Sequence, residues 1–93
     1  MLLAKKILIS GRVQGVSFRM WTVLQSDELG VNGWVRNLKS GEVEAFVQGE
    51  ESQVNRLIDR CRNGPALARV GDIRIENADY DKSLRSFRQT ATE

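Results

Sequence analysis

The sequence predicts an α+β fold in which two helices cover one face of a sheet built mostly from antiparallel strands. Three observations lead to this prediction: stretches in which apolar and polar residues alternate, two stretches in which apolar residues recur at helical spacing, and glycines at the boundaries between them. A length of 93 residues suits one domain with one core. We therefore expect a single domain over residues 1–93.

A strand and a helix are expected at the start of the chain. Residues 5–13 alternate between apolar and polar side chains, which indicates a strand that runs into a loop at Gln14 and Gly15. Residues 18–29 lack proline and glycine, and the helix predicted there ends at Gly30, which suits a C-cap. The face of this helix that is expected to pack carries Phe18, Trp21, Thr22, Gln25 and Leu29.

Two further strands are expected over residues 31–38 and 42–49. They are joined by Lys39-Ser40-Gly41, whose glycine can take the positive φ of a tight antiparallel hairpin. Strand parity puts one set of side chains on each face of the second strand. Glu42, Glu44, Phe46 and Gln48 share one face, and Val43, Ala45 and Val47 share the face expected to meet the helices.

The second half of the chain adds a helix and two strands. The clearest helical stripe in the protein has apolar residues at i, i+3, i+4 and i+7, namely Val54, Leu57, Ile58 and Cys61. Asn63-Gly64-Pro65 ends this helix. A strand is predicted over residues 69–77, and a short final strand that includes Phe87 precedes a polar tail.

Apart from the short final strand, the resulting order is strand, helix, strand, strand, helix, strand. This is the split βαβ arrangement (βαββαβ) of ferredoxin-like domains, an antiparallel-rich sheet with both helices on one face. In this arrangement the first two strands run parallel, so that their carboxyl ends lie at the same edge of the sheet. Arg19 and Asn37 follow those ends, and we expect them to face one pocket.

The composition excludes several kinds of catalytic site. The chain contains no histidine and a single cysteine, Cys61. It therefore lacks the Ser-His-Asp and Cys-His catalytic arrangements, the usual zinc ligand sets and any intrachain disulfide. We expect neither a metal ion nor a cofactor, so any chemistry must use arginine, amides, carboxylates and backbone groups.

The charge and the apolar segments predict where the protein acts. A net charge of +2 is small, so we expect no nucleic-acid partner. The amino-terminal residues lack the order of charged and apolar residues found in a signal peptide, and no later apolar run is long enough to cross a bilayer. These observations predict a cytoplasmic protein without a membrane partner.

Two short motifs predict one anion site. The first, Gly11-Arg12-Val13-Gln14-Gly15-Val16-Ser17-Phe18-Arg19, leaves a strand and enters a helix, so that consecutive N–H groups and the helix N-terminus would point at the same anion. The second, Gly33-Trp34-Val35-Arg36-Asn37, would supply an amide side chain. The first motif matches neither the Walker A pattern nor Gly-x-Gly-x-x-Gly, so it is not a known nucleotide fingerprint.

The two motifs also carry a resemblance. The pattern Gly11-x-Val13-Gln14-Gly15-Val16-x-Phe18-Arg19, followed by Gly33-Trp34-Val35-x-Asn37, resembles the acylphosphatase family in residue type, order and separation. The similarity covers most of the chain up to the region of Val70. It implies a ferredoxin-like fold and a metal-independent, monomeric, cytosolic enzyme that hydrolyses the carboxyl–phosphate bond of small-molecule acyl phosphates.

The resemblance further implies a role for each residue of the site. By matching position, Arg19 binds the phosphate and Asn37 orients the attacking water. The loop that gives its backbone N–H groups to the phosphate oxygens consists of Gln14, Gly15, Val16, Ser17 and Phe18, together with Arg19. The family needs no cofactor.

Acyl phosphate hydrolysis suits a protein without histidine. The leaving carboxylate is a weak base, so no strong general acid is required. Phosphoryl transfer depends mainly on positioning and on neutralising the charge of the equatorial oxygens, which a guanidinium and fixed N–H donors provide. Asn37 cannot act as an ordinary base near neutral pH, and we hypothesise that the proton passes to the phosphate itself.

Other interpretations of the same residues stay open. Arg19 could be a solvated residue of the first helical turn, and Asn37 could shape the hairpin. Ser17 stands where the family often has glycine, and it suits an N-cap better than a nucleophile because nothing in the sequence would activate it. Ser26 and Ser40 replace a common alanine and a common aspartate, and we expect them to affect packing and turn stability.

The leading alternative function is an RNA-binding or small-anion-binding ferredoxin-like module without catalysis. An RNA-binding module would present aromatic and basic side chains on the open face of the sheet. Glu42 and Glu44 are expected on that face, where their carboxylates would repel an RNA backbone.

Overall fold

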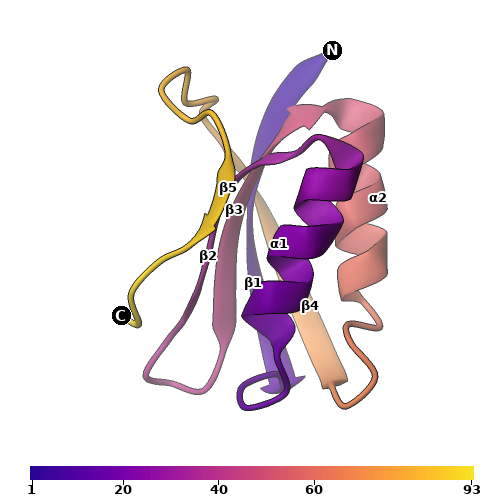
Figure 1. Ribbon diagram of the computed structural model, residues 1–93, viewed down its shortest axis with the longest axis vertical. Coiled ribbons are helices and arrows are strands. Elements are labelled where there is room, and N and C mark those ends of the chain that lie inside the picture. Colours follow the sequence, from indigo (N-terminus) through magenta and orange to yellow (C-terminus); the bar gives the residue numbers. More distant parts are fainter.

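Two helices and five strands form the fold (Figure 1), in a computed structural model that describes residues 1–93. In chain order the elements are β1 (Leu2–Arg12), α1 (Phe18–Leu29), β2 (Asn32–Asn37), β3 (Val43–Glu50), α2 (Glu51–Cys61), β4 (Arg69–Ala78) and β5 (Phe87–Gln89). Every element predicted from the sequence is present, with ends that differ by a few residues. Neither helix has the length and apolar character needed to cross a membrane.

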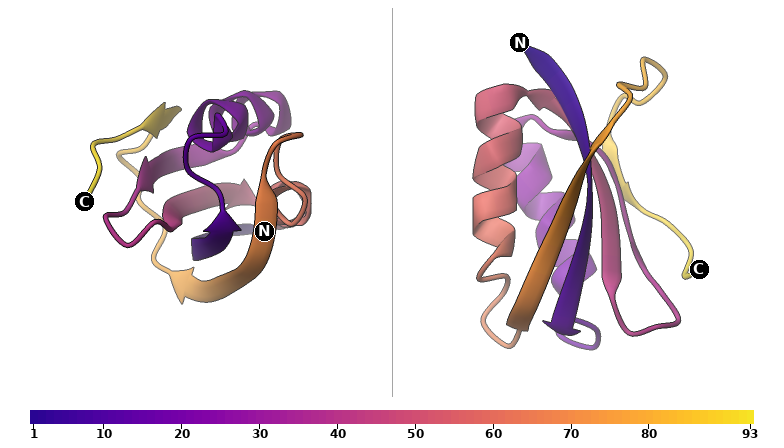
Figure 2. Two further views of the ribbon diagram at one scale, coloured as in Figure 1. Left: turned by 90° about the horizontal axis from the view of Figure 1, so that it is seen from below. Right: turned by 180° about the vertical axis from the view of Figure 1, so that it is seen from behind.

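The strands form one sheet in the order β4-β1-β3-β2-β5. Neighbouring strands are antiparallel except for β2 and β5, which run parallel. Both helices lie on one face of this sheet (Figure 2). The predicted ferredoxin-like α+β fold is therefore confirmed. The parallel pairing of β5 at the edge of the sheet was not predicted.

The core lies between the sheet and the helices. All four residues of the predicted α2 stripe are buried, and so are Val43, Ala45 and Val47 of β3. The strand parity predicted for β3 is thus confirmed, with Glu42, Glu44 and Phe46 only partly buried on the other face. Gln48, the fourth residue predicted for that face, is buried, and its side-chain amide forms two hydrogen bonds with the backbone of Asp81. Burying these aliphatic side chains removes apolar area from water and supplies the main stabilisation of the fold.

The buried face of α1 differs in part from the predicted one. Phe18 and Thr22 are buried as expected, but the third buried residue of the helix is Ser26, whereas Gln25 is only half-buried. The Thr22 hydroxyl donates to the carbonyl of Phe18 at 2.8 Å, while the Ser26 hydroxyl has no hydrogen-bond partner. Polar side chains obscure the apolar stripe of this helix, which explains why its packed face was harder to predict than that of α2.

The register of the sheet brings the ends of β1 and β2 together. Val43, at the start of β3, pairs with Ile9 near the end of β1 on one side and with Asn37 at the end of β2 on the other. The segment that follows β1 and the last residue of β2 therefore lie at one end of the molecule. Figure 1 shows the loop before α1 and the β2–β3 hairpin at this end.

Candidate active site

The loop between β1 and α1 has a backbone shape suited to an anion. Gly15 and Ser17 both have left-handed conformations, with φ of 73° and 64°, and Ser17 is the only non-glycine residue of the chain with a positive φ. The buried side chains of Val16 and Phe18 anchor the loop in the core. When residues in the left-handed conformation alternate with residues in other conformations, successive backbone N–H groups point toward the same concave side of the loop. This is the geometry of an anion-binding nest.

The N–H groups of this loop are free of protein partners. None of the backbone N–H groups from Gln14 to Met20 donates a hydrogen bond within the protein; the first to do so in α1 is that of Trp21, to the Ser17 carbonyl at 3.0 Å. Ser17 occupies the N-cap position, but its hydroxyl does not cap the helix. The unpaired donors and the positive end of the helix dipole favour a negative ligand at this point.

Arg19 and Asn37 line the same cleft, a space of about 290 Å³ beside the loop. The residues that line it are Gly15, Ser17, Phe18, Arg19, Met20, Asn37 and Gln89. The Arg19 guanidinium and the Asn37 amide form no salt bridge or hydrogen bond with other protein groups. The structure therefore brings these two predicted site residues together and leaves both side chains free to bind a ligand.

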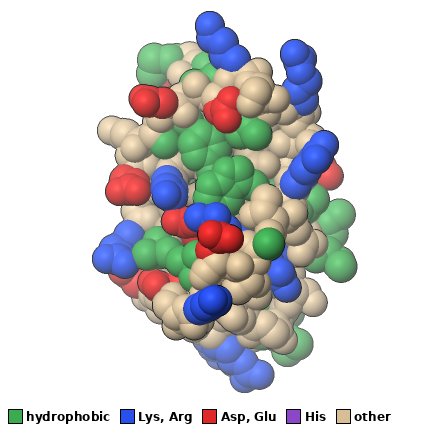
Figure 3. Space-filling model, turned by 90° about the vertical axis from the view of Figure 1, so that its left-hand side faces the viewer, with side chains coloured by type: hydrophobic (Ala, Val, Ile, Leu, Met, Phe, Trp, Pro, Cys, Tyr) green, Lys and Arg blue, Asp and Glu red, His purple; other side chains and the backbone are tan.

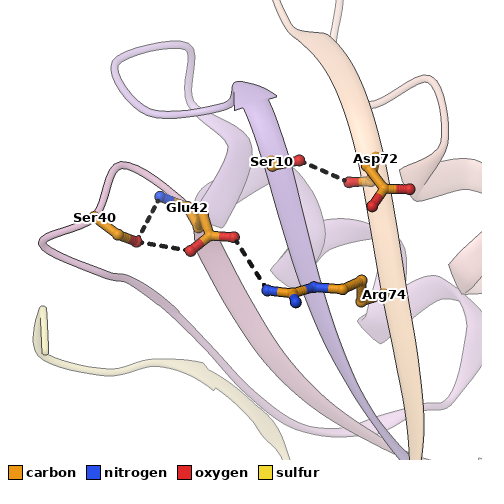
Figure 4. A network of polar contacts seen from close by, with 5 residues as sticks. All are labelled: Ser10, Ser40, Glu42, Asp72 and Arg74. Carbon is orange, nitrogen blue, oxygen red and sulfur yellow. Dashed lines mark hydrogen bonds and ion pairs between the residues drawn. The ribbon is translucent and has the colours of Figure 1, made fainter.

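The hairpin after Asn37 is closed by its own residues. Leu38 N–H donates to the Glu42 carbonyl at 2.8 Å, and Gly41, with φ of 99°, donates to the Leu38 carbonyl at 3.0 Å. In Figure 4 the Ser40 hydroxyl accepts the Glu42 N–H at 3.3 Å and donates to the Glu42 carboxylate at 2.9 Å. The side chain of Asn37 takes no part in the turn, so the structure does not support the interpretation of Asn37 as a turn-forming residue.

The hairpin is also tied to the sheet. A guanidinium nitrogen of Arg74 on β4 lies 3.8 Å from a Glu42 carboxylate oxygen, and the Ser10 hydroxyl of β1 donates to the Asp72 carbonyl at 3.4 Å (Figure 4). These contacts are exposed and individually weak. Together with the Ser40 turn, they link β1, β4 and the hairpin at the end of the sheet that holds the cleft.

The side chain of Gln14 joins the two halves of the site. Its amide nitrogen donates to the Leu38 carbonyl at 2.7 Å and to the Glu42 carbonyl at 2.9 Å. The sequence predicted only a backbone role for Gln14, so this side-chain contact was not predicted. Gln14 and Val16 do not line the cleft with their side chains, because the first turns to the hairpin and the second to the core.

The carboxyl-terminal segment forms a wall of the site that the sequence did not predict. Gln89 of β5 lines the cleft, and the chain continues beside β2, where Thr90 N–H donates to the Val35 carbonyl at 2.9 Å. Glu93 N–H then donates to the Asn37 carbonyl at 3.1 Å, and the Glu93 carbonyl accepts the Lys39 N–H at 3.2 Å. The one signal in the sequence was Phe87, because a residue two positions after a buried strand residue lies on the same face.

The fold and the cleft define a small α+β protein in which backbone N–H groups, one arginine and one asparagine meet at one end of a sheet. The structure places no group of three or more acidic or cysteine side chains so that they could hold a metal ion. Comparisons with known proteins add the family. A family model described as Acylphosphatase matches residues 5–89.

Individual relatives agree with this match. An acylphosphatase of Rhizobium etli is 47% identical over 87 residues, which cover 94% of this chain and 93% of that protein. An acylphosphatase of Nitrobacter hamburgensis is 52% identical over 83 residues, covering 87% and 84%. The crystal structure of acylphosphatase from Bacillus subtilis matches with a TM-score of 0.90 at 30% identity, over 97% of this chain and 99% of that one. The chain belongs to the acylphosphatase family, a family of hydrolases.

Proposed function

We propose that this chain hydrolyses the carboxyl–phosphate bond of acyl phosphates to a carboxylate and inorganic phosphate. Membership of the acylphosphatase family supports this reaction. The observation that carries the proposal is that one cleft is lined by three kinds of group without protein partners. These are the backbone N–H groups of Gly15 and of residues 17–20, the Arg19 guanidinium and the Asn37 amide. We further propose that the domain of residues 1–93 acts as a monomer in the cytoplasm, without a metal ion or a cofactor.

The phosphate is held by the loop and by Arg19. The N–H groups from Gln14 to Arg19 donate to the phosphate oxygens, and the planar guanidinium of Arg19 adds two parallel hydrogen bonds and a full positive charge. Fixed donors stabilise the charge that is spread over the equatorial oxygens during phosphoryl transfer, and they need no reorganisation when the reaction occurs.

Asn37 positions the water. Its side-chain oxygen accepts a hydrogen bond from the water, which directs the water oxygen toward phosphorus, and its NH₂ group donates to the phosphate. The bond from water to phosphorus forms while the bond from phosphorus to the acyl oxygen breaks, and the electron pair of that bond remains on the leaving carboxylate. The proton of the water passes to the phosphate, which leaves as a protonated anion.

The open face of the sheet gives the RNA-binding alternative little support. Trp34 and Phe46 stack there with their ring centroids 6.2 Å apart, amid charged side chains of both signs (Figure 3). Glu44 pairs with two cations, at 2.6 Å from Arg36 and 3.4 Å from Lys6. Both of these cations therefore have a carboxylate partner, whereas the Arg19 guanidinium in the cleft has none.

A direct assay tests the proposed hydrolysis. The purified protein is mixed with benzoyl phosphate, and the loss of the anhydride is followed with and without a chelator. We expect turnover well above the buffer rate, equal in both conditions, and competitive inhibition by inorganic phosphate. Phosphate binding without turnover would favour the small-anion-binding alternative, and turnover lost to the chelator would contradict catalysis without a metal.

A further inference from the structure

Two residues that line the cleft have no part in the proposed hydrolysis. Met20 belongs to α1, and this residue is 59% exposed although its side chain is apolar. Gln89 belongs to β5, and its side-chain amide makes no hydrogen bond within the protein. A neutral amide on one wall and a thioether on the other remain beside the phosphate-binding loop.

The register of β5 fixes which way Gln89 faces. Gly33 pairs with Phe87 and Val35 pairs with Gln89 in the parallel ladder between β2 and β5. Phe87 is buried on the helix-covered side, and alternation along the strand puts Gln89 on the same side. Asn37 follows Val35 by two residues and therefore shares this face. The two amides thus stand on neighbouring strands, beneath the first turn of α1.

The phosphate and the acyl group of a bound acyl phosphate would contact different residues of the cleft. The loop and Arg19 fix the phosphate, as proposed above. The acyl group has to extend away from those anion-binding groups, and the lining residues that are not assigned to phosphate or water are Met20 and Gln89. In this arrangement the acyl oxygens would lie next to the Gln89 amide, and the apolar part of the acyl group would lie against Met20.

We propose that Gln89 is a further catalytic residue, which donates its side-chain N–H to the acyl oxygen and stabilises the carboxylate as it leaves. This inference rests on the proposed hydrolysis. In a loose transition state the bond to the leaving oxygen is largely broken, so that negative charge builds up on the acyl group before the carboxylate departs. A neutral donor stabilises that charge, whereas a carboxylate at position 89 would repel both the phosphate and the leaving group.

The test compares Gln89→Met with Arg88→Met. Gln89→Met keeps the length of the side chain and removes the donor, while Arg88 lies on the opposite face of the same strand and provides the matched control. Both variants and the wild type are assayed with a series of ring-substituted benzoyl phosphates, whose leaving carboxylates differ in basicity. Inhibition by inorganic phosphate, which has no acyl group, reports whether the phosphate-binding part of the site is intact.

We expect kcat/KM of Gln89→Met to fall roughly 3- to 10-fold, the effect of losing one hydrogen bond, and to fall most for the most basic leaving carboxylates. The rate should therefore depend more steeply on leaving-group acidity than in the wild type, with unchanged inhibition by phosphate. Gln89→Glu should lose more activity than Gln89→Met, because it brings a negative charge to the acyl oxygens. Arg88→Met should follow the wild type throughout.

The outcomes separate this inference from the proposed function. A wild type without turnover overturns the proposed hydrolysis and the inference with it. An active wild type with an unchanged leaving-group dependence in Gln89→Met overturns the inference alone. Equal losses in Gln89→Met and Arg88→Met would also overturn it, because they would show a general effect of disturbing β5.

Discussion

At the scale of single residues, the site depends on groups that the fold leaves unsatisfied. Arg19 is a cation in the first turn of α1, where the helix dipole disfavours positive charge, and it has no carboxylate partner. Ser17 holds a left-handed conformation that costs an L-residue with a Cβ on the order of 1 kcal/mol. Both features cost stability in the free protein, and both are explained by an anion bound at the loop.

Substitution of Arg19 is therefore expected to lower activity without lowering stability. Arg19→Ala should abolish detectable hydrolysis, and Arg19→Lys should recover little of it, because an ammonium group cannot reproduce the bidentate guanidinium contact. Stability to urea should be unchanged or raised by about 0.3–1 kcal/mol, since an unfavourable charge is removed from the helix start. Equal activity of the lysine and arginine forms would contradict the bidentate contact.

Asn37 is expected to affect turnover more than binding. Asn37→Ala should lower kcat by roughly 10²- to 10³-fold, the usual cost of losing one preorganised polar group, with a much smaller change in inhibition by inorganic phosphate. The measurement is steady-state hydrolysis of benzoyl phosphate together with phosphate inhibition. Normal kcat with weakened phosphate binding would assign Asn37 to the phosphate instead of the water.

At the scale of elements, the loop before α1 and the β2–β3 hairpin form one unit through Gln14. Gln14→Met should lower the free energy of unfolding by about 1–2 kcal/mol, because both hydrogen bonds to the hairpin carbonyls are lost. Gln14→Glu should cost more near neutral pH, because a carboxylate then faces the same two carbonyl oxygens. Urea unfolding and kcat/KM measured on the same samples check this. A Gln14→Glu variant as stable as the wild type would contradict a stabilising role of the two Gln14 hydrogen bonds.

Helix α1 also offers a stabilising substitution. The hydroxyl of Ser26 is buried without a partner, so Ser26→Ala should raise the free energy of unfolding by about 0.5–1 kcal/mol, since it removes an unpaired polar group and improves helix propensity. Thr22→Val is the matched control, because the Thr22 hydroxyl has a partner in the Phe18 carbonyl. Thermal unfolding of the two variants should show a higher melting temperature than that of the wild type only for Ser26→Ala.

At the scale of the whole molecule, burial of Cys61 in the core makes the stability of the fold depend on pH. Burial raises the pKa of its thiol from 9.0 to about 12. Below pH 9.0 the thiol is protonated in both states, but above it the unfolded chain releases the proton and the folded chain keeps it. The free energy of unfolding should then fall by up to about 1.4 kcal/mol per pH unit from this group, and Cys61→Ala should lose that component. Urea unfolding of the wild type and of Cys61→Ala from pH 8 to 10.5 measures the difference. If the free energies of unfolding of the two proteins change in parallel with pH, the prediction is contradicted.

The sequence predicted those parts of the fold that depend on apolar periodicity. The α2 stripe and the alternation in β3 identified core residues directly, because burial of aliphatic side chains determines where those elements pack. The topology then predicted that Arg19 and Asn37 would face one pocket, since it aligns the ends of β1 and β2. That juxtaposition is confirmed, while the chemical roles of the two residues remain predictions for the assays above.

The parts that the sequence did not predict depend on polar contacts between distant segments. The bond of Gln14 to the hairpin and the pairing of the tail with β2 join side chains or backbone groups that show no local pattern. Gln89 lies in a polar stretch, where Phe87 is the one local signal for its face and the register with Val35 is needed to place it at the cleft. Contacts of this kind are determined by tertiary geometry and not by the spacing of residue types.

The pairing of the tail with β2 has a practical consequence for work with this protein. Glu93 forms backbone hydrogen bonds with Asn37 and Lys39, so a purification tag or fusion partner attached after residue 93 would begin next to Asn37, one of the residues that line the cleft. Met1 lies at the far end of β1, where it contacts Glu50 and Glu51. Tags and surface attachments for the assays should therefore be placed at the amino terminus, which leaves substrate access to the cleft unhindered.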